Sequence, residues 1–198
     1  MSHYYTDNRE LPHDRKEISF RFSGLNFAFQ TDSGVFSKEH VDTGTSILLN
    51  ALKDEVIDGR VLDMGCGYGV IGVVIRKLFE TTEVVMVDVN PRAVECSVSN
   101  AQRNGVDCEI KVSDGFKQVE GSYNIIISNP PIRAGKAVIY GMFEDSARVL
   151  VPGGKLYIVM RKQHGALSAI KKLEELFEMV EIIDKDKGFY VIRACMKN

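Results

Sequence analysis

The chain has 198 residues, of which 44% are hydrophobic and 26% are charged. This length and composition predict one compact domain with a full-sized hydrophobic core and disfavour a second domain. The formal net charge of -2 excludes a global basic field that would hold naked nucleic acid non-specifically. A nucleic-acid substrate would therefore have to meet a local patch.

The four cysteines indicate a cytoplasmic protein without a metal site. Cys66, Cys96, Cys108 and Cys195 are far apart in the chain, and none forms a CxxC pair or lies at metal-ligand spacing from a histidine. We expect their thiols to be reduced. Residues 1–16 are polar and lack an apolar leader segment, and no window approaches the roughly 18 apolar residues of a membrane span. We therefore expect no membrane contact.

The first elements expected along the chain are a β-hairpin and a helix. Residues 17–22 and 25–30 alternate between apolar and polar side chains around a Ser-Gly pair, which predicts a hairpin that could serve as a lid or a docking edge. Apolar residues then recur at helical spacing between Val41 and Leu52. The expected organisation is a polar tail over 1–16 and a single domain over 17–198, divided into a hairpin segment (17–37) and a core (38–198).

The remainder of the chain alternates short apolar runs with longer periodic segments, which is the rhythm of βαβ units. Strands are expected at 60–64, 83–87, 108–112, 123–128 and 155–160, and helices at 70–79, 91–104, 137–150 and 166–177. Two final strand-like runs, 179–183 and 189–196, are joined by a link too short for a parallel crossover, so they should pair antiparallel. The predicted fold is α/β: a Rossmann-like, seven-stranded, mostly parallel sheet with helices on both faces and a C-terminal antiparallel hairpin.

A glycine-rich turn after the first of these core strands indicates a nucleotide-like ligand. Gly65, Gly67 and Gly69, with Cys66 among them, leave the backbone without Cβ atoms, so a ligand and the next helix N-terminus can approach closely. The sequence also matches the dinucleotide pattern GxGxxG, and Asp88 follows about twenty residues later, as that pattern requires. On these features alone an NAD-dependent oxidoreductase remains an alternative.

Three acidic residues at strand ends discriminate between nucleotide ligands. Asp63, two residues before the first glycine, would face the cationic amino-acid end of S-adenosylmethionine but would repel a pyrophosphate; capping of local amides is the alternative role. Asp88, followed by Val89, can accept hydrogen bonds from both hydroxyls of an unphosphorylated ribose. Asp114 can accept from an adenine amino group, unless Asp114-Gly115 is only a turn.

Asn129, Pro130 and Pro131 directly follow the fourth core strand. The Asn129 side-chain oxygen and the Pro130 carbonyl can accept both protons of an exocyclic amine, which exposes the nitrogen lone pair and stabilises the charge that develops. Proline lacks an N–H and has a fixed φ, so both acceptors are held in place. Such a tripeptide alone is often only a turn, but behind a nucleotide site it predicts methyl transfer to a planar nitrogen.

Together, segments 63–69 and 129–131 with Asp88 and Asp114 resemble the Asn-Pro-Pro-aromatic branch of class I amino-methyltransferases. Two upstream segments, TDSGVFS at 31–37 and DTGT at 42–45, make the chain similar to the small-domain (MTS) methyltransferases of the RsmC-like type, which modify guanine N2 in small-subunit ribosomal RNA. The resemblance implies a class I methyltransferase fold with S-adenosylmethionine as cofactor. It further implies ribosomal RNA, within the small subunit, as the partner.

The chain departs from this family pattern at Ile132, where an aromatic residue would stack on the target base, a contact of about 1 to 3 kcal/mol in nucleic-acid complexes. Phe36 or Tyr140 can supply the ring instead. Arg133 and Lys136 follow closely and would hold phosphates beside a flipped base. An equally good interpretation is that they are solvent-exposed loop charges without a binding role.

Other functions account for less of the sequence. A release-factor glutamine methyltransferase or an adenine amino-methyltransferase would need the aromatic residue that Ile132 replaces. An NAD-dependent oxidoreductase leaves Asp63 badly placed and 129–131 without a role. A non-catalytic RNA-binding module would not need Asp63, Asp88 and Asn129 intact. The oligomeric state is left open by the sequence.

Overall fold

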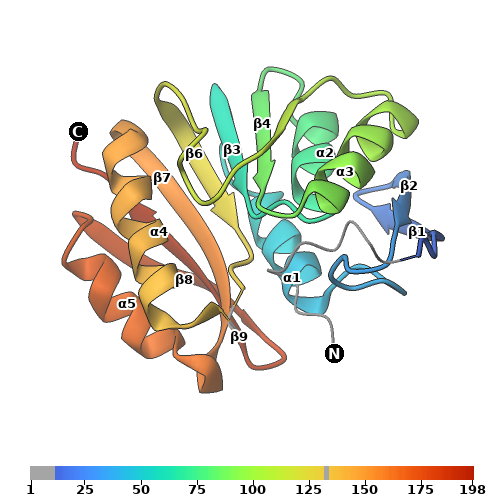
Figure 1. The fold of residues 1–198 in the computed structure, drawn as a ribbon. Helices are drawn as coiled ribbons and strands as arrows, with labels where there is room; N and C mark the ends of the chain where they lie inside the picture. The colour runs from blue at the N-terminus through green and yellow to red at the C-terminus, as the bar shows by residue number, and fades with distance from the viewer. Residues whose placement is uncertain (1–11, 132–133) are drawn as a thin grey trace.

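The computed structural model describes residues 12–131 and 134–198. A seven-stranded sheet with strand order β5-β4-β3-β6-β7-β9-β8 forms its centre, and a two-stranded hairpin, β1-β2, lies to one side (Figure 1). The strands are β1 (Lys16–Phe22), β2 (Leu25–Thr31), β3 (Arg60–Met64), β4 (Glu83–Asp88), β5 (Glu109–Val112), β6 (Tyr123–Ser128), β7 (Leu150–Arg161), β8 (Met179–Asp186) and β9 (Phe189–Cys195). The helices are α1 (Thr43–Leu52), α2 (Val70–Leu78), α3 (Pro91–Arg103), α4 (Lys136–Val149), η2 (Lys162–His164) and α5 (Ala166–Glu174). None of the helices in the two described ranges is long and apolar enough to cross a membrane.

The pairing of the strands confirms the predicted α/β class. Strands β5, β4, β3, β6 and β7 run parallel to one another. Strand β9 is antiparallel to both β7 and β8, so the sheet ends in an antiparallel hairpin. The N-terminal hairpin β1-β2 is also present, as predicted.

Alternate residues of each central strand face opposite helical layers. In β3, Val61 packs into the core that includes residues of α1, α2 and α3, whereas Leu62 and Met64 pack into the core that includes residues of α4 and α5. Asp63 alternates with them and faces α2, where Gly72 N donates to its carboxylate. Helices therefore cover both faces of the sheet, and the two-residue period of the strand decides which layer each side chain enters (Figure 1).

The direction of strand addition reverses between β3 and β6. The chain proceeds outward from β3 to β4 and β5, and then returns to place β6 on the other side of β3. In doubly wound sheets, ligands bind in the crevice outside the carboxyl ends of the strands at such a reversal. Asp63 near the end of β3 and Asn129 directly after β6 both lie at this position.

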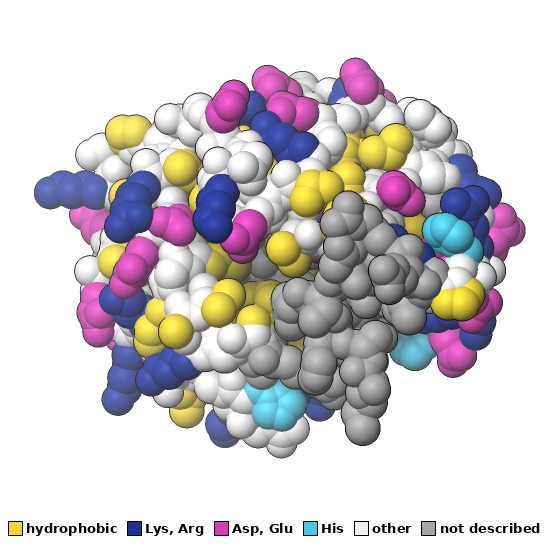
Figure 2. Space-filling view, in the orientation of Figure 1, with side chains coloured by type: hydrophobic (Ala, Val, Ile, Leu, Met, Phe, Trp, Pro, Cys, Tyr) yellow, Lys and Arg dark blue, Asp and Glu magenta, His cyan; other side chains and the backbone are white. Residues whose placement is uncertain are grey.

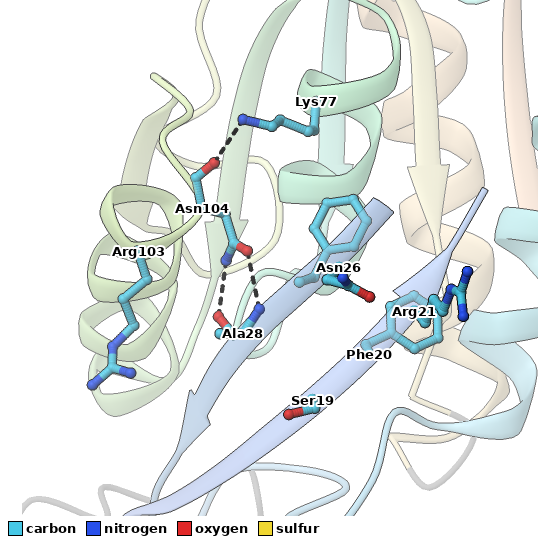
Figure 3. A pocket seen from close by; sticks show the side chains of 9 residues that line it. Ser19, Phe20, Arg21, Asn26, Ala28, Lys77, Arg103 and Asn104 are labelled. Carbon is cyan, nitrogen blue, oxygen red and sulfur yellow. Dashed lines mark hydrogen bonds between the residues drawn. The ribbon is translucent and has the colours of Figure 1, made fainter. Parts of the chain in front are cut away.

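Hairpin β1-β2 is held against α3 by two asparagines. Asn100 accepts from Gln30 N at 2.7 Å and donates to the Gln30 carbonyl at 2.9 Å. Asn104 accepts from Ala28 N at 3.1 Å and donates to the Ala28 carbonyl at 2.9 Å (Figure 3). The two side chains are one helical turn apart, so their amides take the place of a neighbouring strand along the edge of β2. The β2 edge is therefore bonded within the molecule, and a lid or docking role of the hairpin stays a prediction.

The predicted start of β7 is wrong. The Pro152-Gly153-Gly154 segment, which lies between the helix expected to end at 150 and the strand expected to begin at 155, is a bulge inside β7. Tyr123 of β6 pairs with Leu150 of β7, and the next paired residues are Ile125 and Lys155. The chain thus advances two residues along β6 but five along β7. Pro152 has no N–H to pair and Gly153 has a φ of 69°, so the additional residues can loop out of the ladder.

The link between the last two strands is shorter than predicted. Strand β8 extends to Asp186, so the turn consists of Lys187 and Gly188, which have φ values of 46° and 79°. Two consecutive residues with positive φ are typical of the tight turns that match the twist of an antiparallel pair. The charged residues 184–186, predicted as a loop, therefore continue the strand.

We expect Asn100→Ala to lower the free energy of unfolding by about 2 to 4 kcal/mol, because it leaves buried backbone groups of Gln30 and Tyr68 without partners. Asn104→Ala is the matched control. Asn104 makes the same pair of bonds to a β2 residue one turn later, but its bonds to Ala28 are exposed, so water can replace them. Urea denaturation of both variants measures the difference. Equal decreases in the free energy of unfolding would contradict the prediction, because they would show that Asn100 stabilises the fold no more than the exposed Asn104.

Candidate active site

The Asp63 carboxylate is buried between β3 and α2. Its Oδ2 atom accepts a hydrogen bond from Gly72 N at 2.8 Å. A Cβ atom on Gly72 would lie 2.2 Å from Met86 Sδ, so only glycine fits there. The Oδ1 atom is buried and has no hydrogen-bond partner among the described residues. Burial outweighs the bond from Gly72 and, with the charge of Asp88, raises the pKa of Asp63 to about 7.

The glycine-rich turn between β3 and α2 is attached to the end of β4 and open on its other side. Gly65 N and Cys66 N both donate to the Val87 carbonyl at 2.9 Å. Gly65 and Gly67 have φ values of 73° and 57°, and a Cβ atom built on either would meet nothing within 4 Å. These two glycines therefore border open space where a ligand can approach the backbone.

Two other members of the turn face the protein interior. Gly69 has a φ of 89°, and a Cβ atom on it would lie 3.0 Å from Ser97 Oγ, so this glycine permits close packing of the turn on α3. The Cys66 Sγ atom lies 3.6 Å from the same hydroxyl, and burial raises the pKa of the Cys66 thiol. The Cys66 side chain is therefore part of the core, and its backbone is what remains to border a ligand.

Asp88 ends β4 beside the glycine-rich turn. Its Oδ2 atom accepts from Gly67 N at 2.9 Å and its Oδ1 atom from Asn90 N at 2.8 Å. Burial raises the pKa of Asp88 despite these bonds. Val89, which follows, is exposed. Asn90 caps α3 and donates from Nδ2 to the Gly34 carbonyl at 3.0 Å, which ties this strand end to the loop after β2.

Asp114 lies in a structured turn after β5. Its carboxylate is exposed and pairs with Lys117, with an Oδ2 to Nζ distance of 2.6 Å. Ser113 Oγ donates to the Gly115 carbonyl at 2.6 Å and accepts from Gln118 N at 3.1 Å. The structure thus contains the turn that the sequence offered as the alternative reading of Asp114-Gly115, and an adenine amino group would have to share Asp114 with the lysine.

The Asn129 side chain is oriented by α1. Its Nδ2 atom donates to Asp42 Oδ2 at 2.9 Å and to Thr45 Oγ1 at 3.0 Å. Both N–H groups of the amide are therefore used, and no residue within 12–131 or 134–198 donates to its Oδ1 atom. Pro130 and Pro131 follow without N–H donors of their own. The Asn129 Oδ1 atom and the Pro130 carbonyl are therefore the candidate acceptors after β6.

Asp42 and Thr45 are candidate site residues to which the sequence analysis gave no role. Asp42 is the N-cap of α1, and its Oδ2 atom accepts from Thr45 N at 3.1 Å. The spacing of an N-cap and its partner was visible in the sequence. The contact with Asn129 was not, because it joins residues 87 positions apart.

The residues predicted to bind substrate lie on different elements. Phe36, in the loop after β2, has 48% of its surface exposed. Lys136 Nζ lies 5.0 Å from the centre of the Tyr140 ring, and the Tyr140 hydroxyl donates to the Ser168 carbonyl of α5 at 2.9 Å. Tyr140 is thus engaged between α4 and α5. The remaining predicted residues, Ile132 and Arg133, lie outside the described residues.

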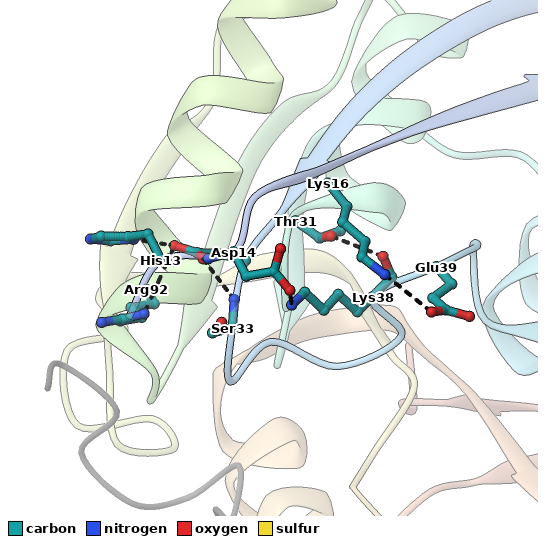
Figure 4. Close-up of polar contacts among 9 residues, drawn as sticks. His13, Asp14, Lys16, Thr31, Ser33, Lys38, Glu39 and Arg92 are labelled. Carbon is teal, nitrogen blue, oxygen red and sulfur yellow. Dashed lines mark hydrogen bonds and ion pairs between the residues drawn. The ribbon is translucent and has the colours of Figure 1, made fainter. Parts of the chain in front are cut away.

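A polar cluster anchors the loop that carries Phe36. Asp32 is buried and accepts from Asp14 N at 2.8 Å and contacts the His13 ring through its other oxygen (Figure 4). Asp14 also pairs with Lys38 on the far side of the loop. Both ends of the loop are therefore fixed, and Phe36 lies between them.

The sequence profile of the methyltransferase small domain matches residues 26–193. The chain belongs to this family. The methyltransferase is 44% identical to a Bacillus subtilis (strain 168) protein named uncharacterized protein YbxB, over 97% of both chains. It is 39% identical to ribosomal RNA small subunit methyltransferase C of Pasteurella multocida (strain Pm70), over 64% of its own length and 39% of that protein.

Solved structures show the same relationship. The T. thermophilus 16S rRNA N2 methyltransferase RsmC, determined in complex with AdoMet and guanosine, superposes with a TM-score of 0.85 at 27% identity, over 94% of this chain and 52% of that chain. A methyltransferase from Pyrococcus furiosus, 23% identical with a TM-score of 0.69 over 80% of this chain and 85% of that chain, shares the fold. These comparisons confirm the family and fold resemblance drawn from the sequence. The chain spans about half, or less, of the length of these named ribosomal RNA methyltransferases.

The raised pKa of Asp63 makes the stability of the free protein depend on pH. The folded state binds a proton more tightly than the unfolded state, whose aspartate has a pKa near 3.8, so the free energy of unfolding falls as pH rises from about 4 to 7. Between pH 5 and pH 8 the free energy of unfolding of the wild type should fall by roughly 2 to 3 kcal/mol, and Asp63→Asn should abolish this fall. Urea denaturation at both pH values tests this. The same substitution at the exposed Asp54, Asp54→Asn, is the matched control. An unchanged pH slope in Asp63→Asn would contradict the assignment.

Proposed function

We propose that the chain transfers a methyl group from S-adenosylmethionine to an exocyclic amine, specifically guanine N2 of small-subunit ribosomal RNA. The observation that carries the proposal is the orientation of the Asn129 amide. Its N–H groups donate to Asp42 and Thr45, and its oxygen remains as an acceptor. The Pro130 carbonyl follows in the chain as a second acceptor. Two fixed acceptors at the end of β6, next to a nucleotide-type turn, suit a nitrogen that carries two protons.

The residues at the end of β3 and β4 fit S-adenosylmethionine, which supplies a methyl group on a cationic sulfur. The buried Asp63 Oδ1 atom would accept from the cofactor's amino group and gain the partner that it lacks. Gly65 and Gly67 border open space for the ligand. Each Asp88 oxygen has one backbone N–H donor and a remaining lone pair for a ribose hydroxyl. We place the adenine between Val89 and the turn at 114–115.

The protein contributes position and charge stabilisation to the transfer. An exocyclic amine on a base is conjugated and barely basic, so its lone pair must be turned out of conjugation and aimed at the methyl carbon. Asn129 Oδ1 and the Pro130 carbonyl would accept the two amine protons, which favours this geometry and stabilises the positive charge that develops on nitrogen. Pro130 and Pro131 restrict the backbone, so the acceptors need no reorganisation during the reaction.

We propose that Phe36 stacks on the target base and that Lys136 and Arg133 contact neighbouring phosphates. Phe36 is exposed and lies in a loop whose ends are fixed, so ordering this loop on a base would cost little entropy. Over α4 and α5 the Lys and Arg side chains are interspersed with Asp and Glu (Figure 2). Such a mixed surface suits a structured ribonucleoprotein particle in the cytoplasm better than free RNA.

The comparisons favour this substrate over the alternatives. Relatives named ribosomal RNA small subunit methyltransferase C reach 39% identity, and the T. thermophilus structure contains guanosine. A dinucleotide pyrophosphate would meet the buried Asp63 carboxylate, which disfavours an NAD-dependent oxidoreductase. A release-factor or adenine methyltransferase would use the same acceptors, so these activities are competing outcomes of the experiment below.

The proposal is tested by transfer of tritiated methyl from S-adenosylmethionine to separate unmethylated small subunits, large subunits, free ribosomal RNA and release factor. We expect label in small-subunit RNA alone. Asn129→Ala should lower the rate by about 100-fold or more, because one acceptor of the developing charge is lost. Asn50→Ala, an exposed asparagine of α1, is the matched control and should keep full activity. Label on release factor, or on no fraction despite measured cofactor binding, would reject the ribosomal RNA substrate.

Cofactor affinity should depend on pH through Asp63. Its pKa of about 7 means that below neutrality the carboxyl must lose a proton before it can face a cationic amino group. We expect the Kd for S-adenosylmethionine to rise by about tenfold per pH unit between pH 7 and pH 5. Isothermal titration calorimetry in two buffers of different ionisation enthalpy would measure both the affinity and the proton released. A weak, pH-independent affinity is expected for Asp63→Asn; a pH-independent wild type would contradict the role of Asp63.

A further inference from the structure

We propose that Asp42 and Thr45 are positioning residues that fix Asn129 as an acceptor-only group and thereby restrict the target to atoms that donate hydrogen bonds. The catalytic part of this inference rests on the function proposed above, whereas the orientation of the amide can be tested by itself. Three hydrogen bonds define the arrangement: Asn129 Nδ2 to Asp42 Oδ2 (2.9 Å), Asn129 Nδ2 to Thr45 Oγ1 (3.0 Å) and Thr45 N to Asp42 Oδ2 (3.1 Å).

Capping of α1 does not by itself require an aspartate at this position. An N-cap needs one acceptor for one backbone N–H, and Ser or Asn serves about as well as Asp. Here a single oxygen, Asp42 Oδ2, receives both the helix N–H of Thr45 and the side-chain N–H of Asn129. An anionic oxygen suits two simultaneous donors. The hydrogen bond from Asn129, which follows β6, plays no part in capping the helix.

The two acceptors decide which way the amide points. If the Asn129 amide were rotated by half a turn, its oxygen would face the Asp42 carboxylate and both N–H groups would lose their partners, which is unfavourable for part-buried groups. The carboxylate also polarises the amide, which strengthens Oδ1 as an acceptor. An unprotonated ring nitrogen or a carbonyl oxygen of the substrate would meet this oxygen without a proton to share, whereas an amine would donate to it.

Gly44 permits the close approach of these groups. A Cβ atom at this position would lie 3.0 Å from Asp42 Oδ2, 3.0 Å from Phe189 Cε1 and 3.5 Å from Asn129 Nδ2. The first two distances are shorter than ordinary van der Waals contacts, so a larger residue would displace the carboxylate or the ring. Asp42 and Thr45 thus bind the Asn129 amide, and Gly44 leaves the space that this contact needs.

The kinetic test is a double-mutant cycle with Asp42→Ser. Serine keeps an N-cap acceptor, but its side chain is too short to reach Asn129 as well. We expect kcat to fall by about 10- to 100-fold, with KM and the Kd for S-adenosylmethionine within about twofold of wild type. In the Asn129→Ala background the same change should lower kcat by less than about threefold, because the residue through which it acts is gone. Asp42→Asn, which keeps an acceptor but loses the charge, should give an intermediate kcat.

The matched control is Asp54→Ser, at an exposed aspartate, which should leave kcat unchanged. Thr45→Val is a second test variant, which keeps the backbone N–H of the cap and removes only the hydroxyl. We expect about a 3- to 10-fold loss of kcat for Thr45→Val. Additive effects of Asp42→Ser and Asn129→Ala, or losses explained by weaker cofactor binding, would overturn the positioning role.

A spectroscopic measurement separates this inference from the proposed function. In a nitrogen-15 NMR spectrum of the wild-type protein, the two side-chain amide protons of Asn129 should exchange slowly with solvent, because both are hydrogen-bonded. Asp42→Ser should accelerate exchange by at least about tenfold while the folded spectrum is retained. If no substrate is methylated but slow exchange is seen, the orientation stands and the function is rejected. Fast exchange in the wild type would reject the orientation whatever the activity.

Discussion

The site depends on the parallel pairing of β3 with β6, in which Leu62 lies opposite Ile126 and Asp63 opposite Ile127. Ser128 Oγ donates to the Met64 carbonyl at 2.7 Å and so joins the two strand ends. This register brings the carboxylate and the Asn129 amide to the same edge of the sheet. A slip of one residue would turn Asp63 to the opposite face, away from α2 and the glycine-rich turn. Packing of the apolar neighbours in β3 therefore fixes the position of Asp63 as well as the core.

Helix α1 completes the site because a polar group placed at the end of a buried strand needs partners. The Asn129 amide lies between sheet and helix, and an unpaired amide there would be costly. Asp42 and Thr45 satisfy both of its N–H groups, and the same two bonds orient its oxygen outward. The same two bonds therefore satisfy a part-buried donor and orient a candidate acceptor, so they bear on stability as well as on the proposed function.

The sequence predicted what repeats locally and missed what is made by distant contacts. The core strands were found because their apolar residues alternate or run continuously, and the glycine-rich turn and Asn129 were placed by following those strands. The bulge at 152–154 was misread because Pro-Gly-Gly has the same composition in a turn and in a distorted strand. Asn100 and Asn104 looked like ordinary helix residues, since their bonds to β2 span 70 or more positions and leave no periodic signal.

Three carboxylates near the site differ in how many N–H groups they receive, and this difference separates their roles. Asp42 accepts two hydrogen bonds, from the backbone N–H of Thr45 and from the Asn129 amide. Asp88 accepts two from the backbone, from Gly67 N and Asn90 N. Asp63 accepts one, on Oδ2, and its buried Oδ1 is unsatisfied among the described residues. An incompletely satisfied carboxylate destabilises the free protein, and a cationic ligand group would remove that cost on binding. The free energy that folding leaves unrecovered at Asp63 is thus available to select a positively charged ligand.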